Sequence, residues 1–309
     1  MNNLTIITYH YVRPIKNSEY PNLKGLELNG FLKQLDYLQE NFSIVKTEEV
    51  ISAVKYNDKL PENACWLTFD DGYKDHHKYV MPELLRRNIS GAFFPSRMAI
   101  QESKILGVNS IQYILANCKN IEGLKLDLNE LCLSNGVLKS ELDKHFLKYG
   151  EANRFDNETI IYIKRMLQHV LPQNIRNNII TSLFEKYIGI SQNEFSKRLY
   201  MNIEDLKDLI RNGMFIGSHG STHRWLNKLS DEEQIKEIKS SLEFLEEVGV
   251  RLIDWIMCYP FGGYNEQTIS ITKKLGAAIG VTIEARTACI GKDNPLKLPR
   301  LDTNDFPQI

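Results

Sequence analysis

Short apolar segments with strand character alternate with amphipathic helical patterns along most of this 309-residue chain. Several of the segments are continuous apolar runs, as expected for strands that are buried on both faces of a sheet. The alternation predicts an α/β protein with a parallel sheet, either open or closed into a barrel. The predicted strands are Leu4–Thr8, Ser43–Lys46, Cys65–Phe69, Gly91–Pro95, Met214–Ser218, Asp254–Tyr259 and Ala278–Ile283.

Local signals mark the helices between these strands. Ser230, followed three residues later by Glu233, is a capping box, and Gly249 is the expected end of that helix. Asn265 is expected to cap the next helix, which Gly276 would close. The apolar stripe predicted for the Ser230 helix consists of Ile235, Ile238, Leu242 and Leu245, and an earlier helix has the stripe Phe31, Leu35, Leu38 and Phe42.

Residues 97–198 break this alternation, because they show helical patterns and little strand character. We interpret them as a helical insertion of about 100 residues, a size that leaves enough chain for a compact seven-strand body. The prediction is therefore a single domain over residues 1–309 with a helical insertion at about 97–198.

Composition excludes several classes of protein. The 38 Lys and Arg residues nearly balance the 39 Asp and Glu residues, so nucleic-acid binding through a general basic field is not expected. No apolar run is long enough to predict a transmembrane segment. The five scattered cysteines predict neither a disulfide framework nor a cysteine zinc site. The N-terminal residues lack the pattern of a signal peptide, which predicts a cytoplasmic protein.

Two adjacent carboxylates, Asp70 and Asp71, follow the predicted strand Cys65–Phe69 and precede Gly72. Charged side chains at the end of a buried strand are costly unless they are paired or bind a metal ion. In parallel α/β folds the carboxyl ends of the strands form the active-site face. The structural alternative is that Asp70 caps the following helix.

Two histidines four residues apart, His219 and His223, follow the predicted strand Met214–Ser218. Imidazoles at this spacing can bind one metal ion from a helical turn or a compact loop. Asp71 can complete a set of two histidines and one carboxylate, which leaves a position open for water, as in catalytic sites. This set suits zinc, and also iron, cobalt or nickel.

Two further segments near later strands carry candidate groups. In Tyr259–Asn265, the proline and glycines fix a tight loop whose backbone N–H groups can face a ligand and act as oxyanion donors. A plain turn before a helix explains the same residues equally well. Arg300 in the segment Leu298–Asp302 could orient a carboxylate through two N–H groups or form a structural ion pair.

Taken together, these motifs resemble the polysaccharide deacetylase family, also called carbohydrate esterase family four. The resemblance covers residues 4–94 and about 203–302 and leaves the helical region unmatched. The segment Tyr9–Val12 resembles the subgroup that removes N-acetyl groups from poly-N-acetylglucosamine. The motifs are TFDDG at Thr68–Gly72, GAFFP at Gly91–Pro95, SHGSTH at Ser218–His223 and YPFGGYN at Tyr259–Asn265.

The resemblance implies a distorted (β/α)7 barrel, which is similar to a TIM barrel. It implies that Asp70 is the catalytic base, that the Phe261 N–H is the oxyanion donor, and that His10 lines the active site. The implied ligands of one divalent metal ion, with zinc as the first expectation, are Asp71, His219 and His223.

Three departures from the family pattern concern the same site. Gly220 stands where the family often has Ser or Thr after the first metal histidine. Cys258 stands where the family often has an arginine that holds the base, and Arg300 is the candidate substitute. No histidine follows His223, so the family's histidine general acid is missing, and His10 and Asp70 are the candidates for its role.

On this resemblance we expect a metal-dependent hydrolase of carbohydrate metabolism that removes an N-acetyl group from an amino sugar. Tyr73, Pro260 and Tyr264 are the expected substrate contacts, although core packing is the more common use of any single aromatic side chain near the motifs. The predicted cytoplasmic location favours a nucleotide- or lipid-linked sugar of cell-surface polysaccharide assembly over wall polymer.

Two alternatives remain open at this point. One is a deformylase or other amidohydrolase acting on a related sugar or small-molecule amide. The other is a carbohydrate-binding protein with a vestigial site. The helical insertion could form a lid, a homo-oligomer interface or a platform at a membrane surface.

Overall fold

The computed structural model describes residues 2–152 and 156–307. The chain divides into two compact units. The first, which we call the sheet unit, contains Met1–Pro14, Gly25–Lys104 and Lys197–Ile309. The second, the helical unit, contains Ile15–Lys24 and Ile105–Ser196.

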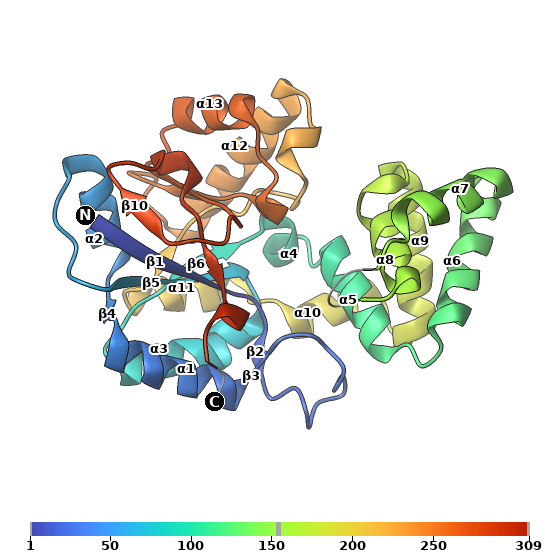
Figure 1. Cartoon of the computed structure of the whole chain (residues 1–309), viewed down its shortest axis with the longest axis horizontal. Helices are drawn as coiled ribbons and strands as arrows, with labels where there is room; N and C mark the ends of the chain where they lie inside the picture. Colours follow the sequence, from blue (N-terminus) through green and yellow to red (C-terminus); the bar gives the residue numbers. More distant parts are fainter. Residues whose placement is uncertain (1, 153–155, 308–309) are drawn as a thin grey trace. The chain divides into compact units, whose positions relative to one another are not determined.

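The centre of the sheet unit is a mainly parallel sheet (Figure 1). The strands β1 and β5 lie side by side in parallel, and their central residues are buried on both faces, as their continuous apolar runs predict. Strand β10 pairs antiparallel with β1 and is the exception to the parallel arrangement in this sheet. The strands are β1 (Asn2–Tyr9), β4 (Ser43–Ile44), β5 (Ala64–Asp71), β6 (Ala92–Pro95), β7 (Phe215–Ile216), β10 (Ala288–Ile290) and β11 (Leu301–Asp302).

Strand pairing continues beyond this sheet. The bridge between Ser218 and Met257 connects the end of β7 to β8 (Ile256–Cys258), which pairs in parallel with β9 (Ile279–Val281). A second bridge joins Val281 to Leu298, and β11 then pairs with β1. The carboxyl ends of β5, β6, β7 and β8 therefore follow one another along the same edge, although these strands lie far apart in the sequence. A short parallel pair, β2 (Val12–Arg13) with β3 (Leu26–Glu27), lies outside this path.

Helices between the strands complete the sheet unit. The sequence signals for two of them are confirmed: Ser230 accepts a hydrogen bond from the Glu233 N–H, and Asn265 accepts one from the Thr268 N–H. Gly249 adopts φ 100° directly after its helix, as a left-handed C-cap requires. The helices are α1 (Leu28–Asn41), α2 (Thr47–Tyr56), α3 (Met81–Arg86), α4 (Arg97–Gln101), α11 (Ile203–Arg211), α12 (Asp231–Val248) and α13 (Glu266–Lys274).

The helical unit has its own apolar core, in which Leu124, Leu128, Tyr162, Leu183 and Phe184 are fully buried. Asn120 and Asn157 cap the helices that follow them. Its helices are α5 (Gly107–Asn117), α6 (Ile121–Ser134), α7 (Lys139–Tyr149), α8 (Glu158–Arg165), α9 (Gln173–Ile188) and most of α10 (Gln192–Leu199).

The α/β class with a mainly parallel sheet is confirmed, and every predicted strand overlaps an observed one. The strands β2, β3, β10 and β11 were not predicted. Most of the helical unit is the segment Ile105–Ser196, which lies within the predicted insertion. The unit also includes Ile15–Lys24, which lies outside it. The single domain with an insertion at 97–198 and the seven-strand barrel stay predictions.

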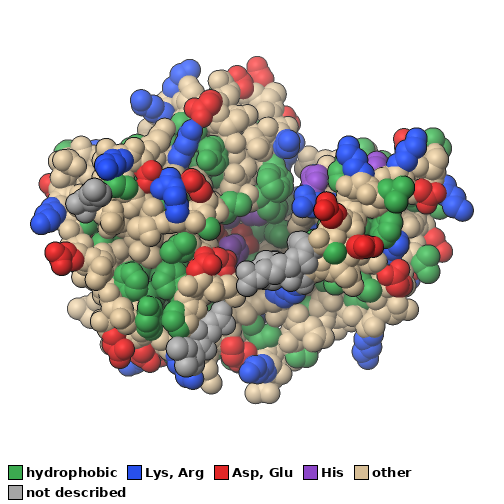
Figure 2. Space-filling model, viewed as in Figure 1, with side chains coloured by type: hydrophobic (Ala, Val, Ile, Leu, Met, Phe, Trp, Pro, Cys, Tyr) green, Lys and Arg blue, Asp and Glu red, His purple; other side chains and the backbone are tan. Residues whose placement is uncertain are grey.

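The predicted stripe of α12 is wrong at Ile235, whose side chain is 36% exposed, because part of this helix presents polar side chains to the protein interior. Among the residues that the structure describes, no helix has the length and apolar character needed to cross a membrane. Basic and acidic side chains are interspersed over the face in Figure 2. That mixture agrees with the balanced charge of the sequence.

Candidate active site

The end of β5 and the loop after β7 bring Asp71, His219 and His223 together. Asp71 Oδ1 lies 3.3 Å from His219 Nε2 and 3.3 Å from His223 Nε2. The three side chains are buried, and within the described residues Asp71 Oδ1 has no hydrogen-bond partner. A buried carboxylate oxygen without a donor, faced by two imidazole nitrogens, is the arrangement that a bound cation satisfies.

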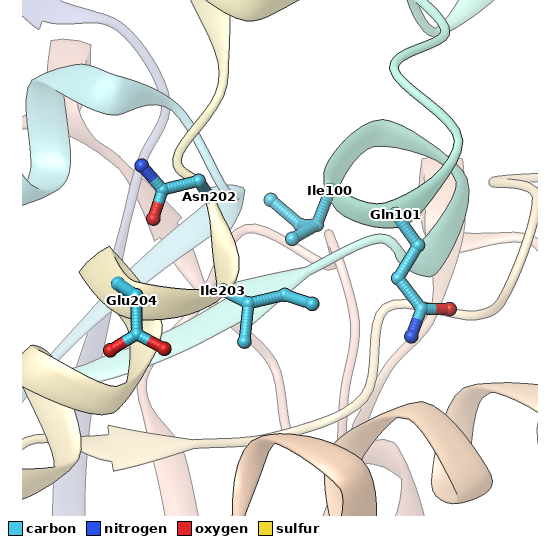
Figure 3. Close-up of a pocket in the computed structure, with 5 residues that line it drawn as sticks. All are labelled: Ile100, Gln101, Asn202, Ile203 and Glu204. Atoms are coloured by element: carbon cyan, nitrogen blue, oxygen red, sulfur yellow. The ribbon is translucent and has the colours of Figure 1, made fainter.

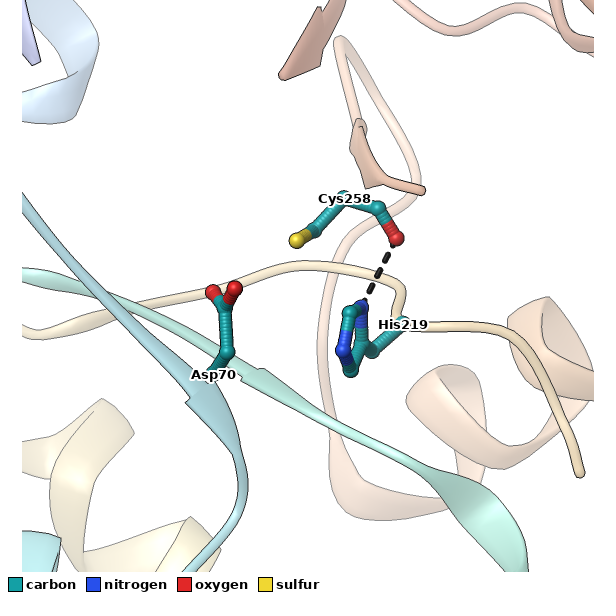
Figure 4. A group of neighbouring side chains, drawn as sticks. All are labelled: Asp70, His219 and Cys258. Atoms are coloured by element: carbon teal, nitrogen blue, oxygen red, sulfur yellow. Dashed lines mark hydrogen bonds between the residues drawn. The ribbon is translucent and has the colours of Figure 1, made fainter. Parts of the chain in front are cut away.

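Neighbouring groups fix the orientation of these ligands. His219 Nδ1 lies 2.8 Å from the Cys258 carbonyl oxygen (Figure 4), so Nδ1 carries a hydrogen and Nε2 is the nitrogen left for a metal ion. The Tyr73 hydroxyl donates a hydrogen bond to Asp71 Oδ2. Burial alone would raise the pKa of Asp71, but His219 and His223 hold it well below its usual value. The donor set and its supports therefore fit a divalent metal ion.

Three residues at this site have left-handed backbone conformations: Asp71 (φ 72°), His223 (φ 55°) and Phe261 (φ 57°). This region is costly for residues other than glycine, and such strain is concentrated at functional sites. Contacts from the surrounding structure therefore have to compensate the free-energy cost of these three conformations.

Asp70 is held by Arg300 in a buried ion pair. Arg300 Nη1 donates to Asp70 Oδ1 at 2.8 Å, and Nη2 donates to Oδ2 at 2.7 Å. Thr8 Oγ1 lies 3.2 Å from Oδ2. Burial raises the pKa of Asp70, but the Arg300 guanidinium outweighs it and holds the pKa well below the usual range. Asp70 is thus a carboxylate at neutral pH, and Arg300, rather than a helix N-terminus, is its partner.

Arg300 itself is fixed by the strands around it. Its Nε donates to the Thr282 carbonyl at 2.9 Å, and Nη1 also reaches Thr68 Oγ1 at 3.1 Å. Its Nη2 lies 3.3 Å from Cys258 Sγ. The cysteine directly before the YPFGGYN motif therefore contacts the arginine that holds Asp70.

His10 follows β1 and lies at the open side of Asp70. Its Nε2 is 4.0 Å from Asp70 Oδ2, and its side chain is 48% exposed. It is close enough to act on a group bound beside Asp70, and it remains accessible to solvent. Its exposure is inconsistent with a buried structural histidine that is satisfied by a backbone carbonyl.

The loop after β8 places Phe261 against His223, one of the candidate metal ligands. The Phe261 ring lies 4.5 Å from the His223 ring and stacks on Trp225 at 4.8 Å between centroids. The backbone hydrogen bonds of this turn are donated by Gly262 and Gly263. Among the described residues, none accepts a hydrogen bond from the Phe261 N–H, so this donor is available to a ligand.

Comparison with known proteins agrees with the motifs. Residues 172–280 match the family model described as polysaccharide deacetylase. Over 89 residues the chain is 32% identical to YxkH of Bacillus subtilis (strain 168), which is provisionally named as a polysaccharide deacetylase. That match covers 29% of this chain and spans about a third (32%) of the length of the relative.

Solved structures with a similar fold cover nearly the whole chain. Deacetylase PplD of Streptococcus pyogenes, in complex with acetate, is 17% identical with a TM-score of 0.60 and coverage of 97% of this chain and 92% of that one. IcaB from Ammonifex degensii is 16% identical, with a TM-score of 0.56 and coverage of 97% and 91%. A de-N-acetylase from Aggregatibacter actinomycetemcomitans is 14% identical, with a TM-score of 0.58 and coverage of 97% and 95%.

Residues 172–280 are thus similar in sequence to the polysaccharide deacetylase family. The family resemblance drawn from the motifs is thereby confirmed, and the α/β fold matches that of solved deacetylases. The family model covers His219, His223 and Phe261 but ends before β10 and begins after Asp70 and Asp71. The structure is what brings those two carboxylates to the site.

The three predicted substrate contacts lie in different environments. Tyr73 is fully buried between Tyr11 and Tyr200, so the structure contradicts its prediction as a sugar-stacking residue and places it as a support for Asp71. Pro260 is also buried, in the turn that positions Phe261. Tyr264 is half-buried and remains a candidate for substrate contact.

Two residues of the site were not singled out from the sequence. Thr8 lies in β1 and Thr282 follows β9, and they contact Asp70 and Arg300 respectively. The signal that could have found Thr8 is its place at the carboxyl end of a buried strand, where a polar residue is unusual.

The sheet unit also has an open hollow of about 670 Å³ (Figure 3). None of the sequence-predicted site residues lines it. Its walls come from α4 and from the start of α11, and the residues drawn there are Ile100, Gln101, Asn202, Ile203 and Glu204.

Proposed function

We propose that this protein is a metal-dependent carbohydrate N-deacetylase. The observation that carries the proposal is the pairing of two adjacent carboxylates with different partners: Arg300 holds Asp70, while Asp71 faces two imidazoles with an unsatisfied oxygen. In this arrangement Arg300 keeps Asp70 available as a base, and Asp71 is one of the proposed metal ligands. A bound divalent metal ion would supply a Lewis acid that activates water and polarises the acyl carbonyl.

In this proposal Asp70 is the general base. It takes a proton from the attacking water, because it stays ionised at neutral pH and is buried next to the metal ligands. Arg300 is a positioning residue that keeps both Asp70 oxygens oriented. The Phe261 N–H donates a hydrogen bond to the oxygen that develops negative charge in the tetrahedral intermediate.

Breakdown of that intermediate requires a proton on the leaving nitrogen. His10 is the proposed donor, since it is accessible and its Nε2 lies 4.0 Å from Asp70 Oδ2. The C–N bond then breaks, and the products are acetate and the free amino sugar. The substrate contact at the rim of the site is assigned to Tyr264, and Pro260 contributes through the shape of its turn.

Asp70→Asn is the direct test. The variant keeps the shape of the side chain but cannot accept the proton, so acetate release should fall by about 10²–10⁴-fold. Metal content, measured by elemental analysis, should stay at the wild-type level because Asp71, His219 and His223 are unchanged. Full activity in Asp70→Asn would overturn the assignment.

A second experiment identifies the acyl group that is removed and the carrier to which the sugar is attached. Mass spectrometry of products from N-acetyl and N-formyl amino sugars, each free, nucleotide-linked and lipid-linked, separates a deacetylase from a deformylase. The prediction of a cytoplasmic nucleotide- or lipid-linked intermediate is supported if those carriers react fastest. Turnover that a chelator leaves unchanged would contradict metal dependence, and glycan binding without turnover would favour a binding protein. The prediction of zinc is tested by restoring chelated protein with zinc, iron, cobalt or nickel.

A further inference from the structure

The loop that carries both metal histidines rests on a polar face of α12. Ser218 Oγ lies 2.8 Å from Ser241 Oγ, and Ser221 Oγ lies 3.3 Å from Ser240 Oγ. Glu237 accepts hydrogen bonds from Thr222, the residue directly before His223. Positions 237, 240 and 241 share one helix face, because residues three and four apart are neighbours on a helix.

Glu237 makes the most extensive of these contacts. The Thr222 N–H donates to Glu237 Oε1, and the Thr222 hydroxyl lies 3.0 Å from Oε1 and 2.9 Å from Oε2. The Glu237 side chain is only 7% exposed, and no Lys, Arg or His forms an ion pair with it in the described part of the chain. Burying a carboxylate without a cationic partner costs free energy. Such a residue is therefore expected where its hydrogen bonds hold other groups in place.

Thr222 lies between His219 and His223, so its hydrogen bonds to Glu237 act on the loop that carries both histidines. His223 has φ 55°, a conformation that persists only where surrounding contacts hold it. Gly220, also between the ligands, has φ 70°, and a Cβ there would lie 3.3 Å from Glu237 Oε1. Glu237 therefore occupies the space beside the glycine and fixes the backbone just before the second ligand.

We propose that Glu237 is a positioning residue for the metal site, which sets metal affinity by holding the loop from Ser218 to His223 in its liganding conformation. The inference rests on the proposed function in one respect: it requires that the protein binds a divalent metal ion at this site. It does not depend on which substrate is deacetylated. Outer contacts of this kind typically change metal affinity by about 10–100-fold when they are removed.

The test measures Zn²⁺ dissociation constants by chelator competition in wild type and in Glu237→Ala, Glu237→Gln and Glu243→Ala. Glu237→Ala should weaken Zn²⁺ binding by about 10–100-fold. Glu237→Gln should lose less, because its amide oxygen can still accept from the Thr222 N–H. Glu243→Ala is the matched control, since Glu243 is an exposed residue of the same helix, and its affinity should equal that of wild type.

Melting of the metal-free proteins separates positioning from general stability. If Glu237→Ala and Glu237→Gln melt lower but bind Zn²⁺ within twofold of wild type, the positioning role is overturned. If Glu237→Ala does not fold, Glu237→Gln and Thr222→Val decide, and unchanged affinity in both overturns it as well. Wild type that binds none of zinc, iron, cobalt and nickel would instead overturn the proposed function. That outcome differs from a loss of affinity that is confined to the variants.

Discussion

Replacing Arg300 with methionine would leave a buried carboxylate without its partner. Arg300 makes two hydrogen bonds to Asp70 and further contacts to Thr68, Thr282 and Cys258, and its side chain is 1% exposed. Removing one partner of a buried ion pair typically destabilises a protein by about 3–5 kcal/mol. For a sheet unit of about 200 residues, where each kcal/mol lowers Tm by about 2–4 °C, the expected loss in Arg300→Met is about 6–20 °C.

The assay is urea and thermal unfolding of metal-free protein at pH 7, with two further variants. In Asp70→Asn/Arg300→Met both charges are gone, so this double variant should be more stable than Arg300→Met alone. Arg286→Met is the control for an exposed arginine, since Arg286 is 42% exposed and pairs with Glu284 and Asp293. It should cost no more than about 1 kcal/mol. The reasoning is refuted if Arg300→Met is as stable as this control, or if the double variant is less stable than Arg300→Met.

The ion pair between Asp70 and Arg300 also predicts the direction in which protein stability changes with pH. In wild type the pKa of Asp70 is depressed in the folded state, so the pair contributes stability above the ordinary aspartate pKa and loses it as the pH falls through the folded pKa. In Arg300→Met the charge and hydrogen bonds of Arg300 are lost, so burial, which raises the pKa of Asp70, is opposed only by His219 and His10, and the folded pKa rises. That variant therefore loses less stability than wild type as the pH falls. The stability gap between the two proteins should therefore be widest at pH 7 and shrink on acidification.

Three other predictions concern single contacts. Tyr73→Phe removes the hydroxyl that donates to Asp71 Oδ2 and should weaken metal binding by up to about tenfold, measured by chelator competition. His10→Gln should slow amide hydrolysis by about 10²-fold or more but slow an activated acetate ester much less, because a good leaving group needs no proton; equal losses would contradict the role of His10. Gly217→Ala should destabilise the sheet unit by about 1–3 kcal/mol in urea unfolding, since its Cβ would lie 2.5 Å from Phe94 Cε1.

The sequence predicts the parts of this site that lie at the ends of apolar strands. Asp70 and Asp71 follow one such run, and His219 follows another, so their meeting at one edge of a parallel sheet is expected from chain geometry. From its own segment, Arg300 is a candidate partner of a carboxylate, and the family resemblance points to Asp70 as that carboxylate. Its partner depends on the register of β11 against β1, and a two-residue strand carries no pattern from which register can be read.

Other features depend on three-dimensional neighbours that no local pattern encodes. Tyr73 looks like a substrate contact because it stands beside the motif, yet Tyr11 and Tyr200 bury it. Ile235 fits the helical stripe of α12 but is exposed, since the inward face of that helix includes Glu237 and Ser241, which meet the histidine loop. A periodicity rule assumes an apolar interior, and it fails where the interior is a polar loop.

The backbone explains why the two adjacent carboxylates can share one site. Successive side chains of a regular strand point to opposite faces, so Asp70 and Asp71 would ordinarily be separated by the sheet. Here Asp71 has φ 72° and Gly72 has φ 77°, and these consecutive left-handed residues end the strand and break the alternation. A Cβ on Gly72 would lie 2.9 Å from Pro95 Cβ, so only glycine permits this turn against β6. The glycine of the TFDDG motif is therefore required by the same geometry that assigns one carboxylate to Arg300 and the other to the histidines.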